Sequence, residues 1–321
     1  MLEFFFYSMS YQKYISSSFP IPSERKQICS AHCTIAELYL TDLCYESNAE
    51  SECEKALMIA NQHDTLLLTS SQSLSQKQQQ LQDRDQGQTP INVSNYCHPD
   101  ALQALANLRL SQSRGMEASN LMMKSYDRMK VGCIAMSKLV GLEVSPNEIN
   151  DSSVEEEEPT AKELENVEEA TNLPSYEFRC QSAKLLLECG SMLQTIPDME
   201  ISNDHQISDM EESTTPATKE SCCEAAVQVL GSLLAENDEV IEIWYLMGCA
   251  FQALENKETA KQYFERALEM LKKVKEGLEQ QDDSNDDDED DIEQQLEEID
   301  AQIEDTEEKI LQLDSSEDME E

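Results

Sequence analysis

Apolar side chains recur at helical spacing in blocks that are separated by polar stretches. In residues 29–60, small or apolar side chains return every three or four positions, and residues 99–130 repeat this plan after a proline–aspartate pair that suits a helix start. Residues 175–190 and 221–238 carry two further patterns of the same period. Only 8 glycines and 9 prolines occur, which is few for a turn-rich β fold. The pattern therefore predicts an all-α protein.

The best-defined unit is residues 241–273, which read as two short antiparallel helices that turn near Asn256. Small side chains stand where the helices would approach closely, and aromatic side chains would fill the space between them. This order of large, small and aromatic residues matches the tetratricopeptide signature. The residues expected to pack this repeat are Trp244, Gly248, Phe251, Ala260, Phe264 and Ala267.

The same spacing fits the other helical blocks less closely, and it predicts four repeats, of which three are degenerate. Such repeats stack so that each buries its neighbour's apolar face, and the stack leaves a concave groove that holds peptides or extended protein segments. We therefore predict a tetratricopeptide-repeat helical solenoid with disordered acidic inserts and an acidic C-terminal tail. The expected organisation is an atypical N-terminal segment at 1–28, an array at 29–273 with inserts at about 62–97, 143–174 and 191–220, and an acidic tail at 274–321 with a possible amphipathic helix at 292–313.

Charge divides the chain unevenly. The 321 residues include 66 acidic and 23 basic side chains, which gives a net charge of −43. Residues 282–321 carry 21 acids and one lysine, and residues 143–172 and 198–220 are also strongly acidic. Such segments are expected to stay solvated. A chain this acidic repels phosphate backbones, so we expect a basic protein partner and no direct nucleic-acid binding. No apolar run is long enough to span a membrane, and no membrane partner is expected.

Signatures of catalysis and metal binding do not occur in the sequence. The chain has no Walker loop, no GxGxxG, no HExxH and no GxSxG motif, so we predict neither an enzyme nor a cofactor. His32 beside Cys33, and His98 beside Cys97, follow no recognised ladder of zinc ligands, and no metal site is predicted. The eleven cysteines read as reduced, small apolar residues, which indicates cytosol or nucleus.

The acidic tail contains an apolar stripe with coiled-coil-like spacing. Two interpretations stand side by side: this helix folds back on the array, or it docks on a basic partner. The residues of the stripe are Ile292, Leu296, Ile299, Ile303, Ile310 and Leu313.

An alternative function is that of a tetratricopeptide scaffold or heat-shock co-chaperone that binds an acidic peptide. Such a site needs lysine, arginine and asparagine in the groove. The groove positions expected in the last repeat carry no lysine or asparagine, whereas the block at 109–138 is rich in basic residues and keeps this alternative open. Those groove positions are Glu242, Tyr245, Cys249 and Gln252.

The sequence resembles the tetratricopeptide chaperones dedicated to the large-subunit ribosomal protein L-four. The matching stretches are residues 34–46, 101–118, 176–190 and 227–254. The resemblance implies a protein of cytoplasm and nucleus that binds newly made L-four, shields its long basic internal loop and escorts it to nuclear pre-ribosomes. Family members look to have further repeats ahead of the segment that matches 34–46, a departure that leaves open a truncated or misassigned start.

Physical reasoning fits a basic ribosomal client, because acidic side chains can screen its charge until ribosomal RNA outcompetes them. The acids expected to bind the client from the groove are Glu37, Asp42, Asp100, Glu188, Glu239 and Glu242.

Overall fold

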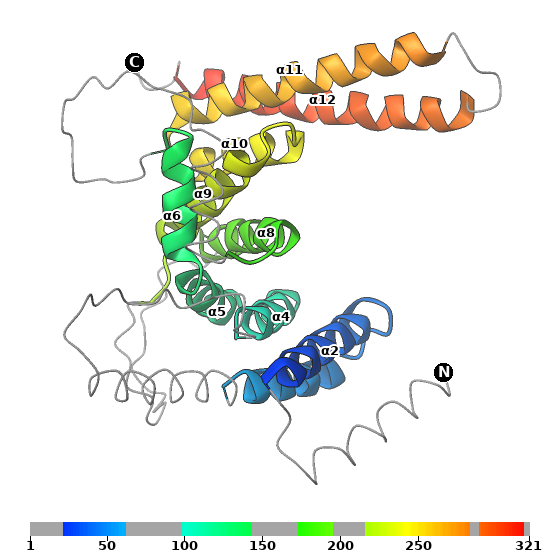
Figure 1. Cartoon of the computed structure of the whole chain (residues 1–321). Coiled ribbons are helices and arrows are strands. Elements are labelled where there is room, and N and C mark those ends of the chain that lie inside the picture. Colours follow the sequence, from blue (N-terminus) through cyan, green and yellow to red (C-terminus); the bar gives the residue numbers. More distant parts are fainter. Residues whose placement is uncertain (1–21, 62–97, 143–172, 195–215, 283–288, 318–321) are drawn as a thin grey trace, which may run out of the picture. The chain divides into compact units, whose positions relative to one another are not determined.

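The structure is a computed structural model in which residues 22–61, 98–142, 173–194, 216–282 and 289–317 are described (Figure 1). Every regular element in these ranges is a helix, so the predicted all-α fold class is confirmed. The predicted inserts lie mostly outside the described residues. The chain divides into two compact units, residues 1–113 and residues 114–321, and each is described by itself. None of the helices in the described ranges combines the length and apolar content that crossing a membrane requires.

The first unit contains three described helices. They are α2 (Pro22–Thr41), a helix over residues 46–61, and α4 (His98–Ser111). α2 begins at Pro22, so residues 22–28, which the sequence analysis placed ahead of the array, belong to the same helix as the block that follows. One buried cluster of this unit is made of small side chains, which let helices approach closely. It consists of Cys29, Ala56, Ala60 and Ala101, with Cys33, Leu57 and Ile59 packed against it, and leucines of α4 are buried as well.

The second unit contains seven described helices. They are α5 (Gly115–Asp127), α6 (Lys130–Leu139), α8 (Tyr176–Gln194), α9 (Lys219–Glu236), α10 (Ile241–Ala253), α11 (Lys257–Asp282) and α12 (Glu289–Glu317). α8 packs on α9, α10 packs on α11, and α9 joins the two pairs by packing against α10 as well. α8 and α9 are antiparallel, because Gly190 near the end of α8 lies beside the start of α9, and Arg179 near the start of α8 lies beside Ser232 near the end of α9. α5 packs on α8, and α6 packs on α9.

α9 lies at the centre of this unit, and its sequence explains why. Thr218 caps the helix in a reciprocal capping box with Ser221, which satisfies backbone N–H groups at the start of the helix. The helix then carries small and apolar side chains all round, so it can be covered on several faces. Gly231 lets α6 approach α9 closely, because a Cβ atom there would lie 2.7 Å from Cβ of Ser137.

A buried arginine joins α8 to α9. The side chain of Arg179 is 2% exposed, and its guanidinium group donates hydrogen bonds to Oγ of Ser232 at 2.8 Å and to the backbone carbonyl of Pro174 at 3.0 Å. It also forms an ion pair with Glu236. A charge this deeply buried is tolerated because several acceptors surround it.

The last pair, α10 and α11, is packed around a glycine. A Cβ atom on Gly248 would lie 2.6 Å from two atoms of the Phe264 ring, and that ring is fully buried. Ala260 and Ala267 on α11 are also fully buried, and Phe251 is 9% exposed. Side-chain Oδ1 of Asn256 accepts the backbone N–H of Thr259 at 3.2 Å, which caps the start of α11. The turn therefore falls at the residue where the sequence places it.

Candidate client-binding surface

The groove positions of a helical repeat lie on the first helix of each pair, so α10 is the natural starting point. Its residues Trp244 and Phe251 pack against Tyr263 of α11, with ring centroids 5.6 Å and 5.4 Å away. Tyr245 meets Phe264 edge to face at 5.5 Å. The sequence analysis did not single out Tyr263, although its position one residue before Phe264 could have indicated an aromatic contact. These ring contacts fix the rotation of α10 about its own axis. That rotation determines which side chains of α10 face away from α11.

Two of the expected groove positions on α10 have partners from other helices. Glu242 is exposed, and Lys184 of α8 lies 2.7 Å from its carboxylate. The hydrogen bond with Glu242 raises the pKa of Lys184, so this lysine stays charged. The hydroxyl of Tyr245 donates to the carboxylate of Asp305 in α12 at 2.5 Å. This face of α10 is therefore bordered by α8 on one side and contacted by α12.

The remaining predicted acids of the second unit are exposed. Glu188 lies on α8, one helical turn after Lys184, so both side chains lie on one face of that helix. Glu239 lies in the connection between α9 and α10, where its backbone N–H donates to Asn237 at 3.0 Å and its side chain remains exposed. Glu242 therefore pairs with Lys184, Glu188 lies one turn away on the same helix face, and Glu239 lies before the start of α10.

The predicted acids of the first unit fall into two kinds of environment. Glu37 on α2 and Asp42 just after it are exposed. Asp100, in the first turn of α4, is partly buried, and this burial raises its pKa despite the opposing charge of Lys26. Asp100 is thus the least accessible of the predicted acids, and the charge that faces it belongs to Lys26.

Four carboxylates of α12 form neither an ion pair nor a side-chain hydrogen bond within the part of the chain that the structure describes, and the sequence analysis did not list them individually. All four are exposed. The sequence indicated only that the tail is rich in acids. Which of these acids are unpaired depends on how α12 packs, and the sequence does not show that. The four carboxylates are Glu293, Glu297, Glu298 and Glu304.

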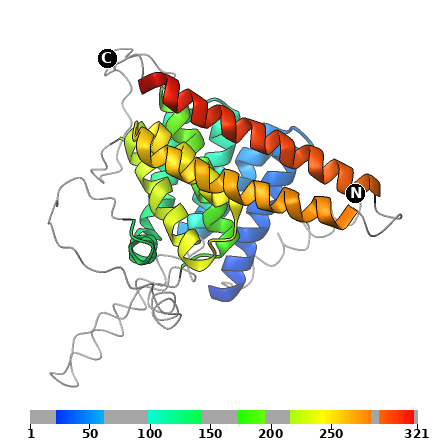
Figure 2. The same cartoon turned by 90° about the horizontal axis from the view of Figure 1, so that it is seen from above.

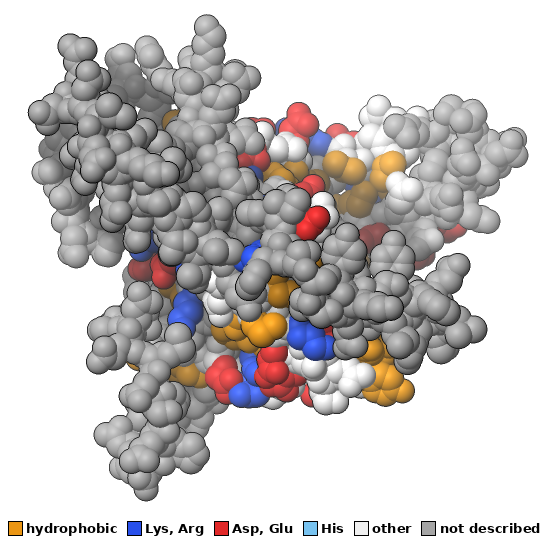
Figure 3. Space-filling model, turned by 60° about the horizontal axis from the view of Figure 1, so that its bottom comes forward, with side chains coloured by type: hydrophobic (Ala, Val, Ile, Leu, Met, Phe, Trp, Pro, Cys, Tyr) orange, Lys and Arg blue, Asp and Glu red, His pale blue; other side chains and the backbone are white. Residues whose placement is uncertain are grey.

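The basic block at 109–138, which kept the acidic-peptide alternative open, is partly engaged. Arg109 is 8% exposed and binds Glu50 at 2.6 Å. Arg114 pairs with Glu117 at 2.6 Å. Exposed lysines remain on α5 and α6, and Lys130 lies over the Tyr126 ring. Figure 3 shows Lys and Arg side chains among Asp and Glu on one face of the molecule, without a large patch of either sign in the coloured area.

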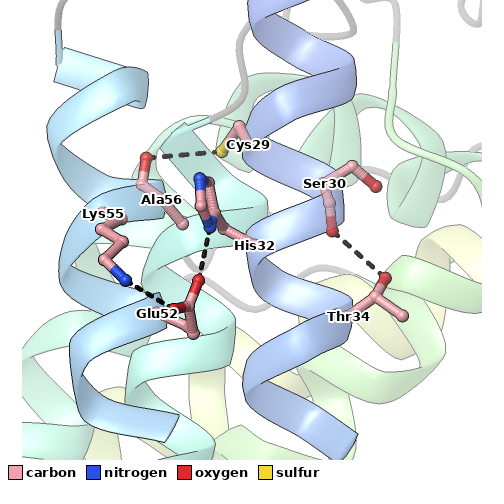
Figure 4. A network of polar contacts seen from close by, with 7 residues as sticks. All are labelled: Cys29, Ser30, His32, Thr34, Glu52, Lys55 and Ala56. Carbon is pink, nitrogen blue, oxygen red and sulfur yellow. Dashed lines mark hydrogen bonds and ion pairs between the residues drawn. The ribbon is translucent and has the colours of Figure 1, made fainter. Parts of the chain in front are cut away.

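The first unit also contains a polar network that explains a histidine considered as a metal ligand (Figure 4). His32 of α2 lies 2.6 Å from the carboxylate of Glu52, and Lys55 reaches the same carboxylate at 2.6 Å. Within the described residues, no three His, Cys, Asp or Glu side chains are arranged to hold a metal ion. Cys97 and the side chain of His98 lie outside the described residues. The network joins α2 to the helix over residues 46–61.

The protonation state of Glu52 links this network to pH. Burial opposes ionisation of Glu52, but hydrogen bonds from Lys55 and His32 outweigh it and lower its pKa from the ordinary value of 4.5. A folded-state pKa below the unfolded value means that the carboxylate stabilises the fold above about pH 4.5. That contribution is lost as the pH falls through the lower, folded-state pKa.

Several of the described cysteine thiols are buried, and burial changes their reactivity. All the described cysteines are free thiols. Burial raises the pKa of Cys53 and of Cys189 to about 12, and that of Cys133 to about 11. Thiols with such pKa values are poor nucleophiles and poor metal ligands at neutral pH, so these side chains act as small packing residues.

Comparison with known proteins gives the helix pair a name. Residues 241–270 match the tetratricopeptide repeat. The matched segment begins with α10 and ends within α11. It includes the contact between Gly248 of α10 and the Phe264 ring of α11. The chain therefore contains a tetratricopeptide repeat at the position that the sequence predicts.

The chain is also similar to a protein of Schizosaccharomyces pombe (strain 972 / ATCC 24843) named "Probable assembly chaperone of rpl4". The identity is 23% over 253 residues. The alignment covers 78% of this chain and 47% of the relative, so the chain spans about half the length of the curated relative that it matches.

Proposed function

We propose that this protein is a non-enzymatic assembly chaperone that binds a newly made, basic protein of the large ribosomal subunit, the L-four protein. In this proposal it works in cytoplasm and nucleus and escorts its client to pre-ribosomes. The observation that carries the proposal is the similarity to the relative named as a probable assembly chaperone of rpl4. The tetratricopeptide repeat at 241–270 supports a role in protein binding.

Electrostatics supports a basic client. The net charge of −43 attracts a basic protein over several ångströms, and salt weakens that attraction. Exposed carboxylates of the first unit (Glu37) and of the second (Glu188 and Glu239) are available to lysine and arginine side chains of the client. Glu242 already pairs with Lys184, so binding of a client cation to Glu242 would break that ion pair as it forms a new one.

The proposal is tested by measuring the affinity of the full chain for purified L-four protein by fluorescence anisotropy at low and high salt. We expect tight, salt-sensitive binding, and we expect the variant E37Q/E188Q/E239Q to bind about ten-fold more weakly, because several exposed charges each contribute modestly. The matched control, E258Q/E265Q/E276Q, loses the same charge from exposed positions on α11 and should bind nearly as the wild type does.

One result would contradict the proposed client, and another would contradict the predicted groove acids. Absence of L-four binding would remove the client. Equal weakening by the two triple variants would mean that net charge, and not the predicted groove acids, determines the affinity. Binding of a peptide ending in EEVD, with no enrichment of any ribosomal protein from cell extract, would favour the co-chaperone alternative instead.

A further inference from the structure

α12 folds back along α11, and the two helices run side by side (Figures 1 and 2). Its apolar stripe is the surface that packs. Leu313 is 5% exposed, and the other described members of the stripe are half-buried; the side chain of Ile292 lies outside the described residues. Folding back is thus the arrangement in the structure, and the acidic tail is helical over most of its length. The half-buried members are Leu296, Ile299, Ile303 and Ile310.

Ion pairs join α11 to α12, and their order along the two helices shows that the helices run antiparallel. Lys261 near the start of α11 pairs with Asp314 near the end of α12 at 2.6 Å. Lys275, further along α11, pairs with Asp300 at 2.5 Å. A third pair joins Lys272 to Glu307 of α12 at 2.8 Å. All three pairs are exposed to solvent, so each contributes little stability and is weakened by salt.

α12 also reaches α10. Asp305 accepts the hydroxyl of Tyr245 at 2.5 Å. Cys249, one turn further along α10, is half-buried, and burial raises its pKa against the opposing charge of Lys309 on α12. Tyr245 and Cys249 are the positions that the repeat pattern assigns to the groove. The chain's own acidic helix, packed on α11, therefore reaches two groove positions of the last repeat.

We propose that α12 is a releasable cover of the last repeat, which leaves α10 when a client segment rich in lysine and arginine takes over its carboxylates. The proposal rests on the proposed function for the charge of the client. The lysines of α11 and the cations of such a segment compete for the same acids, among them Asp300 and Asp314. Glu293, Glu297 and Glu304 have no internal cation to give up and would make the first contact.

The apolar contribution to docking is modest, which makes release feasible. Among the described apolar residues of α12, only Leu313 is buried, because a two-helix contact leaves one side of the stripe near solvent. The like charges of α12 are crowded on its remaining faces, and the lysines of α11 relieve this repulsion. A polycation would relieve it equally well from outside. Departure of the helix would then expose Tyr245 and Cys249 to the client.

Cys249 gives a direct readout. The full chain is treated with N-ethylmaleimide, and the rate of modification of Cys249 is measured by mass spectrometry and divided by that of Cys44, which is exposed in the first unit. A synthetic oligo-arginine peptide should raise the ratio about five-fold, because both access and the thiolate fraction of Cys249 increase. An oligo-glutamine peptide should leave the ratio unchanged.

The variant D300N/E307Q/D314N provides an independent test, because it removes the three ion pairs and keeps the apolar stripe. Its Cys249 should react faster than that of the wild type without any peptide. The single variant K272E should act in the same direction, and the charge reversal K272E/E307K should restore protection. Unchanged circular dichroism would show that the helices remain folded in each variant.

The outcomes for the cover and for the proposed function are distinguishable. If L-four or oligo-arginine binds, by anisotropy, while Cys249 stays as protected as in the free chain, the cover proposal is wrong and the chaperone function stands. If oligo-arginine uncovers Cys249 but L-four does not bind, the cover stands and the client is wrong. Rapid reaction of Cys249 in the free wild-type chain, at the rate of Cys44, would overturn the docking of α12 itself.

Discussion

Replacement of Gly248 by alanine should destabilise the last repeat, because the new methyl group has no room. It would lie 2.6 Å from two carbons of the Phe264 ring and 2.9 Å from a third, whereas carbon atoms prefer about 3.5–4.0 Å. The ring is fully buried and cannot swing into solvent. Overpacking of this kind costs roughly 1–3 kcal/mol, and the better helix propensity of alanine returns about 1 kcal/mol. Because three atoms of one rigid ring are involved, we expect a net loss of about 2 kcal/mol.

Gly277 supplies the matched control, because it is also a helical glycine of α11's helix pair, beyond the matched repeat, and a Cβ atom there meets nothing within 4 Å. Gly277→Ala should raise the free energy of unfolding by about 0.5–1 kcal/mol. Trp244 is the protein's single tryptophan, and its ring contacts Tyr263 of α11 at 5.6 Å. Its fluorescence during urea unfolding of the full chain therefore reports separation of α10 from α11.

A pair of results would refute this reasoning. The first is a Gly248→Ala variant as stable as the wild type, or more stable. The second is strict additivity of Gly248→Ala with Phe264→Leu, since a smaller side chain at 264 should relieve the clash and make the double variant less destabilised than the sum of its parts.

Three further perturbations follow from contacts within each unit. Glu52→Gln should lower stability at neutral pH by about 1 kcal/mol, and the difference from the wild type should shrink below about pH 4.5, as measured by urea unfolding across pH. Arg179→Met should cost about 2–3 kcal/mol, with partial recovery in R179M/E236Q, and full stability of the single variant would contradict the role of the buried charge. Gly231→Ala should cost roughly 1–3 kcal/mol in thermal unfolding, and adding Ser137→Gly should relieve it; an unaffected melting temperature would mean that α6 does not approach α9 closely.

Local pattern predicted the last repeat well. The spacing of Gly248, Ala260 and Phe264 is set by helix geometry alone, so sequence reasoning could place both helices and the turn at Asn256. The contact of Tyr263 with two aromatic side chains was missed, because the rotation of α11 about its own axis decides which ring faces α10.

Contacts between residues far apart in the sequence were harder to predict. Periodicity described the apolar stripe of α12 but could not choose between folding back and docking elsewhere, because both bury the same side chains. Periodicity also could not identify Glu52, on the next helix, as the partner of His32. Asp100 and Glu37 were predicted together as groove acids, but Asp100 is partly buried whereas Glu37 is exposed.

The central place of α9 has a consequence for synthesis. Ribosomes make the chain from its N-terminus, so α6 and α8 leave the ribosome before the helix that covers them both. Until residues 219–236 emerge, the guanidinium of Arg179 has neither Ser232 nor Glu236 to bind, and the face of α6 that meets Gly231 remains uncovered. Nascent chains that stop short of α9 should therefore be the form of this protein most prone to aggregation.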